Sequence, residues 1–225
     1  MRAYLIATPG SPGATAAACA SEASALILDC ADLKASPGAG FHGPLSSSEH
    51  RSRLFLRIGA VDGPDIAAEL SAAMLLRPDA VVLPVAHGRD IAHLGARLAV
   101  EEAENGWPDC ATQIIALIAS AEGALNAGRL ADAGPRLAGI GWDAGALAAE
   151  LQAQGLDAAG GWSAPLAQVR GLVRLAAAAA HVEAIEAAYP GGDAGFARLL
   201  AAARRDGFGA VLAASPAQIP LIRQA

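Results

Sequence analysis

The sequence predicts an α/β protein whose eight parallel strands close into a single TIM-like (β/α)8 barrel. Apolar bursts recur along the 225 residues at spacings of roughly 20–35 residues, with helical stretches between them, which is typical of parallel β/α units. Several bursts carry no polar break, as expected for strands covered on both faces. Eight such units allow the sheet to close and lose its edges. Since this fold commonly needs roughly 250 residues, the barrel is expected to be shortened.

The predicted strands are short apolar runs bounded by turn formers or acids. Residues 23–29 are rich in Ala, Leu and Ile up to Asp29, whereas residues 53–58 alternate between Arg and apolar side chains before closing on Ile58. The full set is residues 2–8, 23–29, 53–58, 79–84, 112–119, 136–142, 181–186 and 207–214.

Helical stretches follow most of these strands. Asp62 is the expected N-cap of a helix at 65–76 and Asp90 that of a helix at 91–102, because a carboxylate there accepts hydrogen bonds from the first N–H groups. Turn formers dominate residues 34–49, which predicts a loop. The remaining predicted helices are residues 14–22, 121–131, 144–154, 166–179 and 194–205.

An open doubly wound sheet is the alternative architecture. It would need a glycine-rich turn with free N–H groups after the first strand. Pro9 and Pro12 stand in that turn and lack the N–H, so the closed barrel is preferred. No linker is long enough to divide the chain, and residues 1–225 are expected to form one domain.

Composition and charge argue against several classes of partner. A formal net charge of −6 does not favour nucleic acid or an anionic membrane surface. No apolar run reaches the ~18 residues of a membrane span, and the N-terminal run is too short for a signal peptide. Three scattered cysteines suit a reducing cytoplasm. Lys34, the single lysine, lies among turn formers, which argues against a Schiff-base mechanism.

Charged side chains gather where the predicted strands end. Asp29 and Asp32 follow the second strand, Arg57 ends the third and Asp143 follows the sixth. Because chemistry in a (β/α)8 barrel takes place at the carboxyl ends of the strands, this rim is the predicted site. Arg57 is the leading candidate, since a guanidinium offers a planar fork to a carboxylate. The alternatives are an internal salt bridge from Arg57 to Asp29, and capping roles for Asp32 and Asp143.

Six short motifs occur in one order along nearly the whole chain. They are residues 8–11 (Thr-Pro-Gly-Ser), 26–32 (Leu-Ile-Leu-Asp-Cys-Ala-Asp), 56–58 (Leu-Arg-Ile), 81–84 (Val-Val-Leu-Pro), 116–126 (Ala-Leu-Ile-Ala-Ser-Ala-Glu-Gly-Ala-Leu-Asn) and 207–219, which begins Gly-Phe and ends Ser-Pro-Ala-Gln-Ile. Together they resemble the citrate lyase beta-subunit-like branch of the HpcH/HpaI aldolase family, which includes malyl-CoA lyases. The resemblance implies a TIM barrel that reversibly cleaves carbon–carbon bonds in 3-hydroxy acids or their CoA thioesters.

The resemblance also implies roles for individual residues. Arg57 and Asp29 are the expected catalytic residues, and Arg57 is expected to bind substrate together with Gly10, Ser11 and Pro84. On the residues alone, Ser11 equally suits a strand-to-helix turn. The implied ligand is a small carboxylate or an acyl-CoA, and the implied assembly is a homo-oligomer.

Mg²⁺ is the cofactor that the resemblance implies, yet its two family ligands are not matched. Ala119 and Ala146 stand where the family has a glutamate after strand five and an aspartate after strand six. A methyl group offers no oxygen to a hard cation. The sequence therefore predicts no metal at the family positions, with Asp29, Asp32 and Asp143 as candidates for a relocated site.

Two hypotheses about function follow from these substitutions. The first is a pseudoenzyme, a barrel that has lost Mg²⁺-dependent lyase activity and binds a carboxylate or a partner. The second is an active lyase or aldolase whose metal has moved. Since residues 218–219 lie close to the end of the sequence, the family's C-terminal helical tail is expected to be lacking.

Four further residues have weaker assignments. Arg170 matches a family arginine, although its place on a predicted helix favours a solvated side chain. Glu186 ends the seventh strand near the rim. His87 and His181 lack a metal-ligand spacing such as HExxH, so neither is expected to bind a metal.

Overall fold

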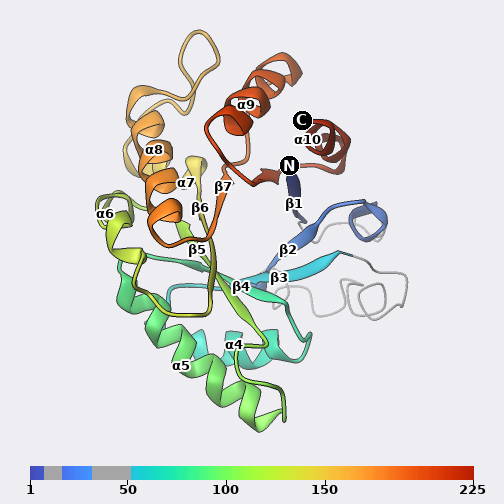
Figure 1. The fold of residues 1–225 in the computed structure, drawn as a ribbon, viewed down its shortest axis with the longest axis vertical. Helices are drawn as coiled ribbons and strands as arrows, with labels where there is room; N and C mark the ends of the chain where they lie inside the picture. Colours follow the sequence, from blue (N-terminus) through green and yellow to red (C-terminus); the bar gives the residue numbers. More distant parts are fainter. Residues whose placement is uncertain (8–16, 32–51) are drawn as a thin grey trace.

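The computed structural model describes residues 1–7, 17–31 and 52–225, and its strands form a closed parallel barrel (Figure 1). Each strand pairs with the next one in the chain, and the last returns to pair with the first. The strands are β1 (Arg2–Ile6), β2 (Ala25–Asp29), β3 (Arg53–Arg57), β4 (Ala80–Pro84), β5 (Gln113–Ile118), β6 (Leu137–Trp142), β7 (Glu183–Glu186) and β8 (Ala210–Ala213). The predicted fold class and all eight predicted strands are confirmed.

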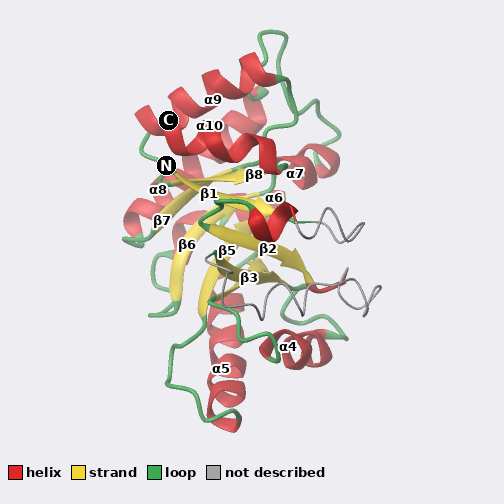
Figure 2. Cartoon of the chain, turned by 90° about the vertical axis from the view of Figure 1, so that its right-hand side faces the viewer, coloured by secondary structure: helices red, strands yellow, loops and turns green. Residues whose placement is uncertain are grey.

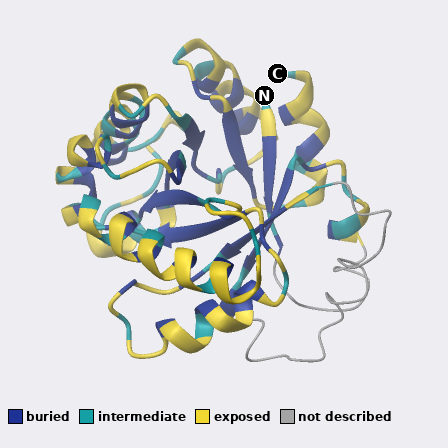
Figure 3. Cartoon of the chain, turned by 60° about the horizontal axis from the view of Figure 1, so that its bottom comes forward, coloured by how far each residue is buried: buried dark blue, intermediate teal, exposed yellow. Residues whose placement is uncertain are grey.

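Helices surround the barrel, with their buried faces on the strands and their exposed faces outward (Figures 1, 2 and 3). None of the helices in the described ranges is both long and apolar enough to cross a bilayer. They are α4 (Ile66–Met74), α5 (Gly88–Glu104), α6 (Ala121–Leu125), the 3₁₀ helix η1 (Ala127–Leu130), α7 (Ala144–Glu150), α8 (Ala164–Ala179), α9 (Asp193–Arg205), the 3₁₀ helix η2 (Pro216–Gln218) and α10 (Ile219–Gln224).

Several helix ends differ from the prediction. The N-cap of α4 is Asp65, so the prediction for Asp62 is wrong. Helix α5 begins at Gly88, three residues before the expected start, and Asp90 lies inside its first turn. The Asp90 carboxylate accepts hydrogen bonds from the preceding Ala86 and His87 N–H groups at 2.9 and 2.7 Å. An acid can therefore stabilise a helix start from within the first turn as well as from the cap position.

Two other segments also differ from the prediction. The helix expected at 121–131 is divided into α6 and η1 at Asn126. Helix α10 was not predicted; it buries Ile219 and Ile222 and packs against β1. The predicted loop at 34–49 lies outside the described residues, as does the start of the helix predicted at 14–22.

The barrel interior is built from alternate residues of the strands. Its apolar core consists of Tyr4, Ala25, Ile27, Phe55, Ala80, Val82, Ile115, Leu117, Ile185, Ala210 and Leu212. On β6 the corresponding positions are Gly139 and Gly141, over which Ile185 of β7 packs so closely that a Cβ at Gly139 would lie 3.0 Å from it. Strand β6 therefore gives backbone rather than side chains to the inner wall.

Polar groups close the amino end of the barrel. Arg2 pairs with Glu183 at 2.5 Å, and the Tyr4 hydroxyl donates to the same carboxylate. Burial, reinforced by that carboxylate, raises the pKa of Tyr4. Tyr4 also packs edge-on against Phe55, with ring centroids 5.2 Å apart, while Arg53 covers the Phe55 ring. These described side chains therefore close the floor of the interior at the amino ends of the strands.

A buried ion pair ties α5 to the strands. Glu102 is 1% exposed and accepts hydrogen bonds from both terminal nitrogens of Arg136, at 2.9 and 2.8 Å. It also accepts from the backbone N–H groups of Cys110 and Thr112. Burial raises the pKa of Glu102, but the Arg136 and backbone hydrogen bonds outweigh burial and leave the pKa below its ordinary value. The ionised carboxylate is therefore the stable form in the fold.

We expect Glu102→Gln to lower the free energy of unfolding by about 3–5 kcal/mol at pH 7, because a buried pair loses one charge. The pKa of Glu102 is lower in the folded chain than in the unfolded chain. The stabilisation is thus present above the ordinary glutamate pKa of about 4.3 and is lost as the pH falls through the lowered value. Urea unfolding of both proteins at pH 7 and near pH 3 checks this. If the difference in free energy of unfolding between wild type and variant is the same at both pH values, the prediction is contradicted.

Candidate functional site

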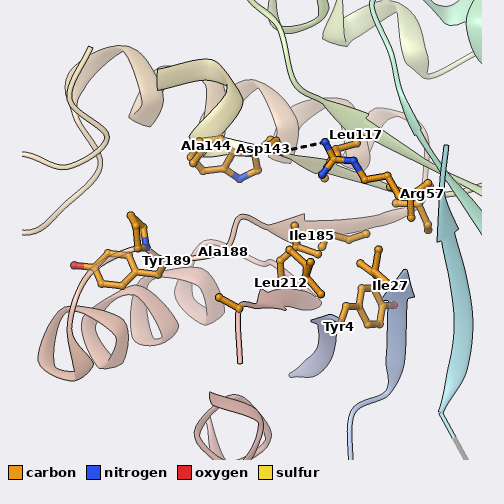
Figure 4. A pocket seen from close by; sticks show the side chains of 18 of the residues that line it. Tyr4, Ile27, Arg57, Leu117, Asp143, Ala144, Ile185, Ala188, Tyr189 and Leu212 are labelled. Atoms are coloured by element: carbon orange, nitrogen blue, oxygen red, sulfur yellow. Dashed lines mark ion pairs between the residues drawn. The ribbon is translucent and has the colours of Figure 1, made fainter. Parts of the chain in front are cut away.

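A cavity of about 650 Å³ opens at the carboxyl ends of the strands and reaches down to Tyr4 and Phe55 (Figure 4). Its wall is mostly apolar and includes Ile27, Leu117 and Leu212 from the barrel interior. Among the described residues that line it, the charged side chains are Asp29, Arg57 and Asp143, at the mouth. This combination of an apolar body and a few convergent polar groups is typical of a small-molecule site.

The charged groups at the mouth lie around one guanidinium. Asp29 and Arg57 end β2 and β3 at directly paired positions, and Arg57 Nε lies 3.7 Å from Asp29 Oδ2. On the other side, Arg57 Nη2 lies 3.6 Å from Asp143 Oδ2, the contact drawn in Figure 4. The predicted proximity of Arg57 and Asp29 is confirmed. The sequence did not predict that Asp143 also reaches Arg57.

Each aspartate uses one oxygen for the backbone and turns the other toward Arg57. Asp29 Oδ1 accepts from the Ala31 N–H at 2.9 Å, and Asp143 Oδ1 caps α7 by accepting from the Ala146 N–H at 3.0 Å. The contacts from Arg57 to the two Oδ2 atoms exceed hydrogen-bonding distance. Within the described part of the chain, these three groups therefore keep unused hydrogen-bonding capacity at the cavity mouth.

The other predicted substrate-binding residues are not placed at this cavity. Gly10 and Ser11 lie outside the described residues, as does Asp32, which was predicted as a candidate ligand of a relocated metal. Pro84 ends β4 but is not part of the cavity wall, to which β4 contributes Val82. Their predicted roles stay predictions.

Glu186 and Arg170 form a structural ion pair rather than a site. Glu186 is fully buried and accepts from Arg170 Nε at 2.5 Å and from Trp142 Nε1 at 3.1 Å. Arg170 also donates to Asp206 at 2.7 Å and stacks over Phe208. Burial raises the pKa of Glu186, and the Arg170 charge opposes that shift. The expectation that Arg170 is solvated is wrong, because α8 turns this residue inward.

The described residues do not fit Mg²⁺. Ala119 follows β5 and Ala146 lies in the first turn of α7, and neither side chain carries an oxygen. Asp29 and Asp143 have the Arg57 guanidinium, itself a cation, between them. In the described ranges no three His, Cys, Asp or Glu side chains are grouped so that they could hold a metal. His87 instead contacts Glu122 at 3.2 Å.

Solved structures resemble this chain over almost its full length. The citrate lyase beta subunit from Mycobacterium tuberculosis is 26% identical, with 99% of this chain and 95% of that chain covered and a TM-score of 0.78. The same subunit complexed with oxaloacetate and magnesium gives 26% identity, the same coverage and a TM-score of 0.76. The chain therefore resembles the citrate lyase beta subunit in its fold, over nearly the full length of both chains.

Another structure of the Mycobacterium tuberculosis protein was solved in complex with magnesium, acetoacetate and coenzyme A. It is 25% identical to this chain, with 99% of this chain and 79% of that chain covered and a TM-score of 0.77. No protein-family model matches the sequence, and no curated protein does. The resemblance predicted from the six motifs is confirmed. The homo-oligomer that it implies stays a prediction.

Aromatic side chains form a part of the cavity wall that the sequence analysis missed. Trp142, Trp162 and Tyr189 line it and pack edge to face, with centroids 4.9 and 5.8 Å apart. The hydroxyl of Tyr189, which follows β7, donates to the carbonyl of Gly160 at 2.7 Å. This hydrogen bond links the segment between α7 and α8 to the barrel. The chain has only three Trp and two Tyr, so their rarity was the available signal.

We expect the two arginines to respond differently to substitution. Arg57→Met should cost less than about 1 kcal/mol, because its ion pairs are long and a third of the side chain is exposed. Arg170→Met should cost about 3–5 kcal/mol at pH 7, because Glu186 is left as a buried, unpaired charge.

Chemical denaturation of both variants checks this contrast. The deficit of Arg170→Met should shrink as the pH falls, since protonation removes the uncompensated Glu186 charge. Equal losses in the two variants would mean that Arg57 is also a structural residue.

Proposed function

We propose that this barrel binds a small carboxylate at Arg57 and has lost the Mg²⁺-dependent carbon–carbon lyase activity associated with its family. The arrangement of Arg57 supports binding: a guanidinium at the cavity mouth, loosely paired, with donors directed into an apolar site. The related structures were obtained with oxaloacetate, acetoacetate and other small carboxylates. The cavity is large enough for ligands of that size.

The loss of lyase activity follows from the residues at the family's metal positions. Cleavage next to a carbonyl builds up negative charge, and a metal ion that offsets such charge contributes several kcal/mol to lowering the barrier. Ala119 and Ala146 supply no ligand for that ion. Each 1.36 kcal/mol of lost stabilisation lowers the rate about tenfold, so the family reaction should be slower by orders of magnitude.

An active lyase with a relocated metal is the alternative. Of the three aspartates considered for it, Asp29 and Asp143 are described, and a shared cation would have to take the place of the Arg57 guanidinium between them. Like charges in that position repel, and Mg²⁺ also demands nearly octahedral oxygen ligands. We therefore favour metal-independent binding.

We expect pyruvate and acetoacetate to raise the melting temperature of the wild type equally with Mg²⁺ and with EDTA. Arg57→Met should abolish this shift, because the ligand carboxylate loses the two parallel N–H donors of the guanidinium.

The wild type should show no Mg²⁺-dependent cleavage of malyl-CoA or citramalyl-CoA. Thermal-shift titrations and a thioester-cleavage assay check both points, with Arg53→Met as a control for loss of an arginine away from the mouth. Turnover that EDTA abolishes would contradict the proposal.

We expect a metal site to return when both carboxylates are restored. The double variant Ala119→Glu, Ala146→Asp should be stabilised by Mg²⁺, by about 2.7 kcal/mol at a concentration one hundred times its Kd. The control Ala119→Gln, Ala146→Asn has matched size and no charge, and should not respond. Differential scanning calorimetry with and without Mg²⁺ measures the effect. If the wild type responds as strongly as the restored variant, a relocated metal site exists.

A further inference from the structure

We propose that the ligand of this cavity is an α-amino acid with a large apolar side chain, whose carboxylate meets Arg57, whose ammonium meets one of the two aspartates beside Arg57 (Asp29 or Asp143), and whose side chain enters the barrel. This inference rests on the proposed carboxylate binding and specifies the rest of the ligand. Two observations carry it independently: the charge balance at the mouth and the apolar depth of the cavity.

The described residues at the mouth carry more negative than positive charge. Arg57 supplies one positive charge, and Asp29 and Asp143 supply two negative charges within 4 Å of its guanidinium. A ligand bearing only a carboxylate adds a third negative charge to this group, so it binds more weakly than a ligand that also carries a positive charge. A ligand bearing an ammonium beside its carboxylate adds no net charge and offers an opposite partner both to Arg57 and to an aspartate.

The hydrogen-bonding geometry also favours such a head group. Asp29 and Asp143 each hold one oxygen in a backbone hydrogen bond and turn Oδ2 toward the guanidinium at 3.7 and 3.6 Å. These distances are too long for direct bonds, so both acceptors and the Arg57 donors are available to a ligand. An ammonium has three donors and can donate to the Oδ2 of one aspartate from the cavity side, while the guanidinium stays between the two aspartates. A carboxylate on the adjacent carbon then lies within reach of Arg57.

The apolar wall of the cavity below the mouth favours a ligand with an apolar body. Ile27, Leu117, Ile185 and Leu212 line the cavity down to the edge-packed rings of Tyr4 and Phe55 (Figure 4). Among the described residues at the floor, Tyr4 carries a hydroxyl, and this hydroxyl already donates to Glu183. A polar ligand body would lose its hydration here without gaining partners. Burying an apolar side chain removes it from water at no such cost.

Three probes with one indole body separate the contributions of the head group: L-tryptophan, indole-3-propanoate, which lacks the ammonium, and tryptamine, which lacks the carboxylate. L-alanine supplies the head group without the body. By isothermal titration calorimetry on the full chain, L-tryptophan should bind roughly tenfold or more tightly than each of the other three, because each charged group it adds gains charge-assisted hydrogen bonds.

Asparagine variants of the aspartates give a signature that a structural role would not produce. Asn can replace Asp at a cap, so Asp143→Asn should leave α7 and the melting temperature nearly unchanged. It should weaken L-tryptophan and tighten indole-3-propanoate, because one negative charge leaves the mouth. Asp29→Asn should act in the same direction, while Arg57→Met should weaken both ligands.

The outcomes also separate this inference from the proposed function. Equal affinities for indole-3-propanoate and L-tryptophan would leave carboxylate binding standing and overturn the amino-acid assignment. Equal affinities for tryptamine and L-tryptophan would overturn both, since the carboxylate would then contribute nothing. Equal affinities for L-alanine and L-tryptophan would overturn the role of the apolar cavity. Absence of binding by all four probes would overturn the inference, and the pyruvate titration then decides the proposed function on its own.

Discussion

Closure of the parallel barrel fixes which side chains share its interior, and the rest of the site depends on that constraint. In a strand, side chains alternate between the two faces, and pairing in register makes equivalent positions of neighbouring strands face the same way. Asp29 and Arg57 are paired at the ends of β2 and β3. They follow Ile27 and Phe55, which face the interior, by two residues. The salt-bridged pair at the mouth is therefore a direct result of the register and needs no special loop.

The same register explains why the cavity is apolar below and charged above. The inward positions along β2 run from Ala25 through Ile27 to Asp29, and those along β3 from Arg53 through Phe55 to Arg57. Along these two strands, the inward-facing polar side chains thus occur at the strand ends, where the barrel meets water. The lower end is closed by the contacts of Tyr4 with Phe55 and Glu183, whereas the upper end keeps a cavity of about 650 Å³. A ligand of this barrel must therefore place its charged groups at one end and its apolar surface at the other.

What the sequence predicted well were features set by local pattern. Every strand was predicted, because short uninterrupted apolar runs identify buried parallel strands, and Asp29 and Arg57 were placed together because they end consecutive strands. Contacts between residues from elements that are far apart in the sequence were not predicted. Asp143 follows β6, which is not adjacent to β3, and the long side chain of Arg57 spans the gap between them. The burial of Arg170 depends on Glu186 and Asp206 from other elements, which helical periodicity alone does not reveal.

The contrast between the two arginines distinguishes scaffold from site. Arg170 donates from Nε to Glu186 and from Nη1 to Asp206 and stacks its plane on Phe208, and its Nη2 is buried, so the side chain is held within the fold. Arg57 has two carboxylates beside it, yet both lie beyond hydrogen-bonding distance, and each of them is held back by a backbone N–H. An arrangement that serves stability alone would let the guanidinium close onto one carboxylate in a bidentate pair. Because these three groups stay beyond hydrogen-bonding distance, their opposite charges are only partly compensated within the fold. A ligand that carries both charges can form the hydrogen bonds that they do not form with one another. Preorganisation of this kind is what a binding site gains from a rigid barrel rim, and among the described residues it arises from Arg57, Asp29 and Asp143 alone.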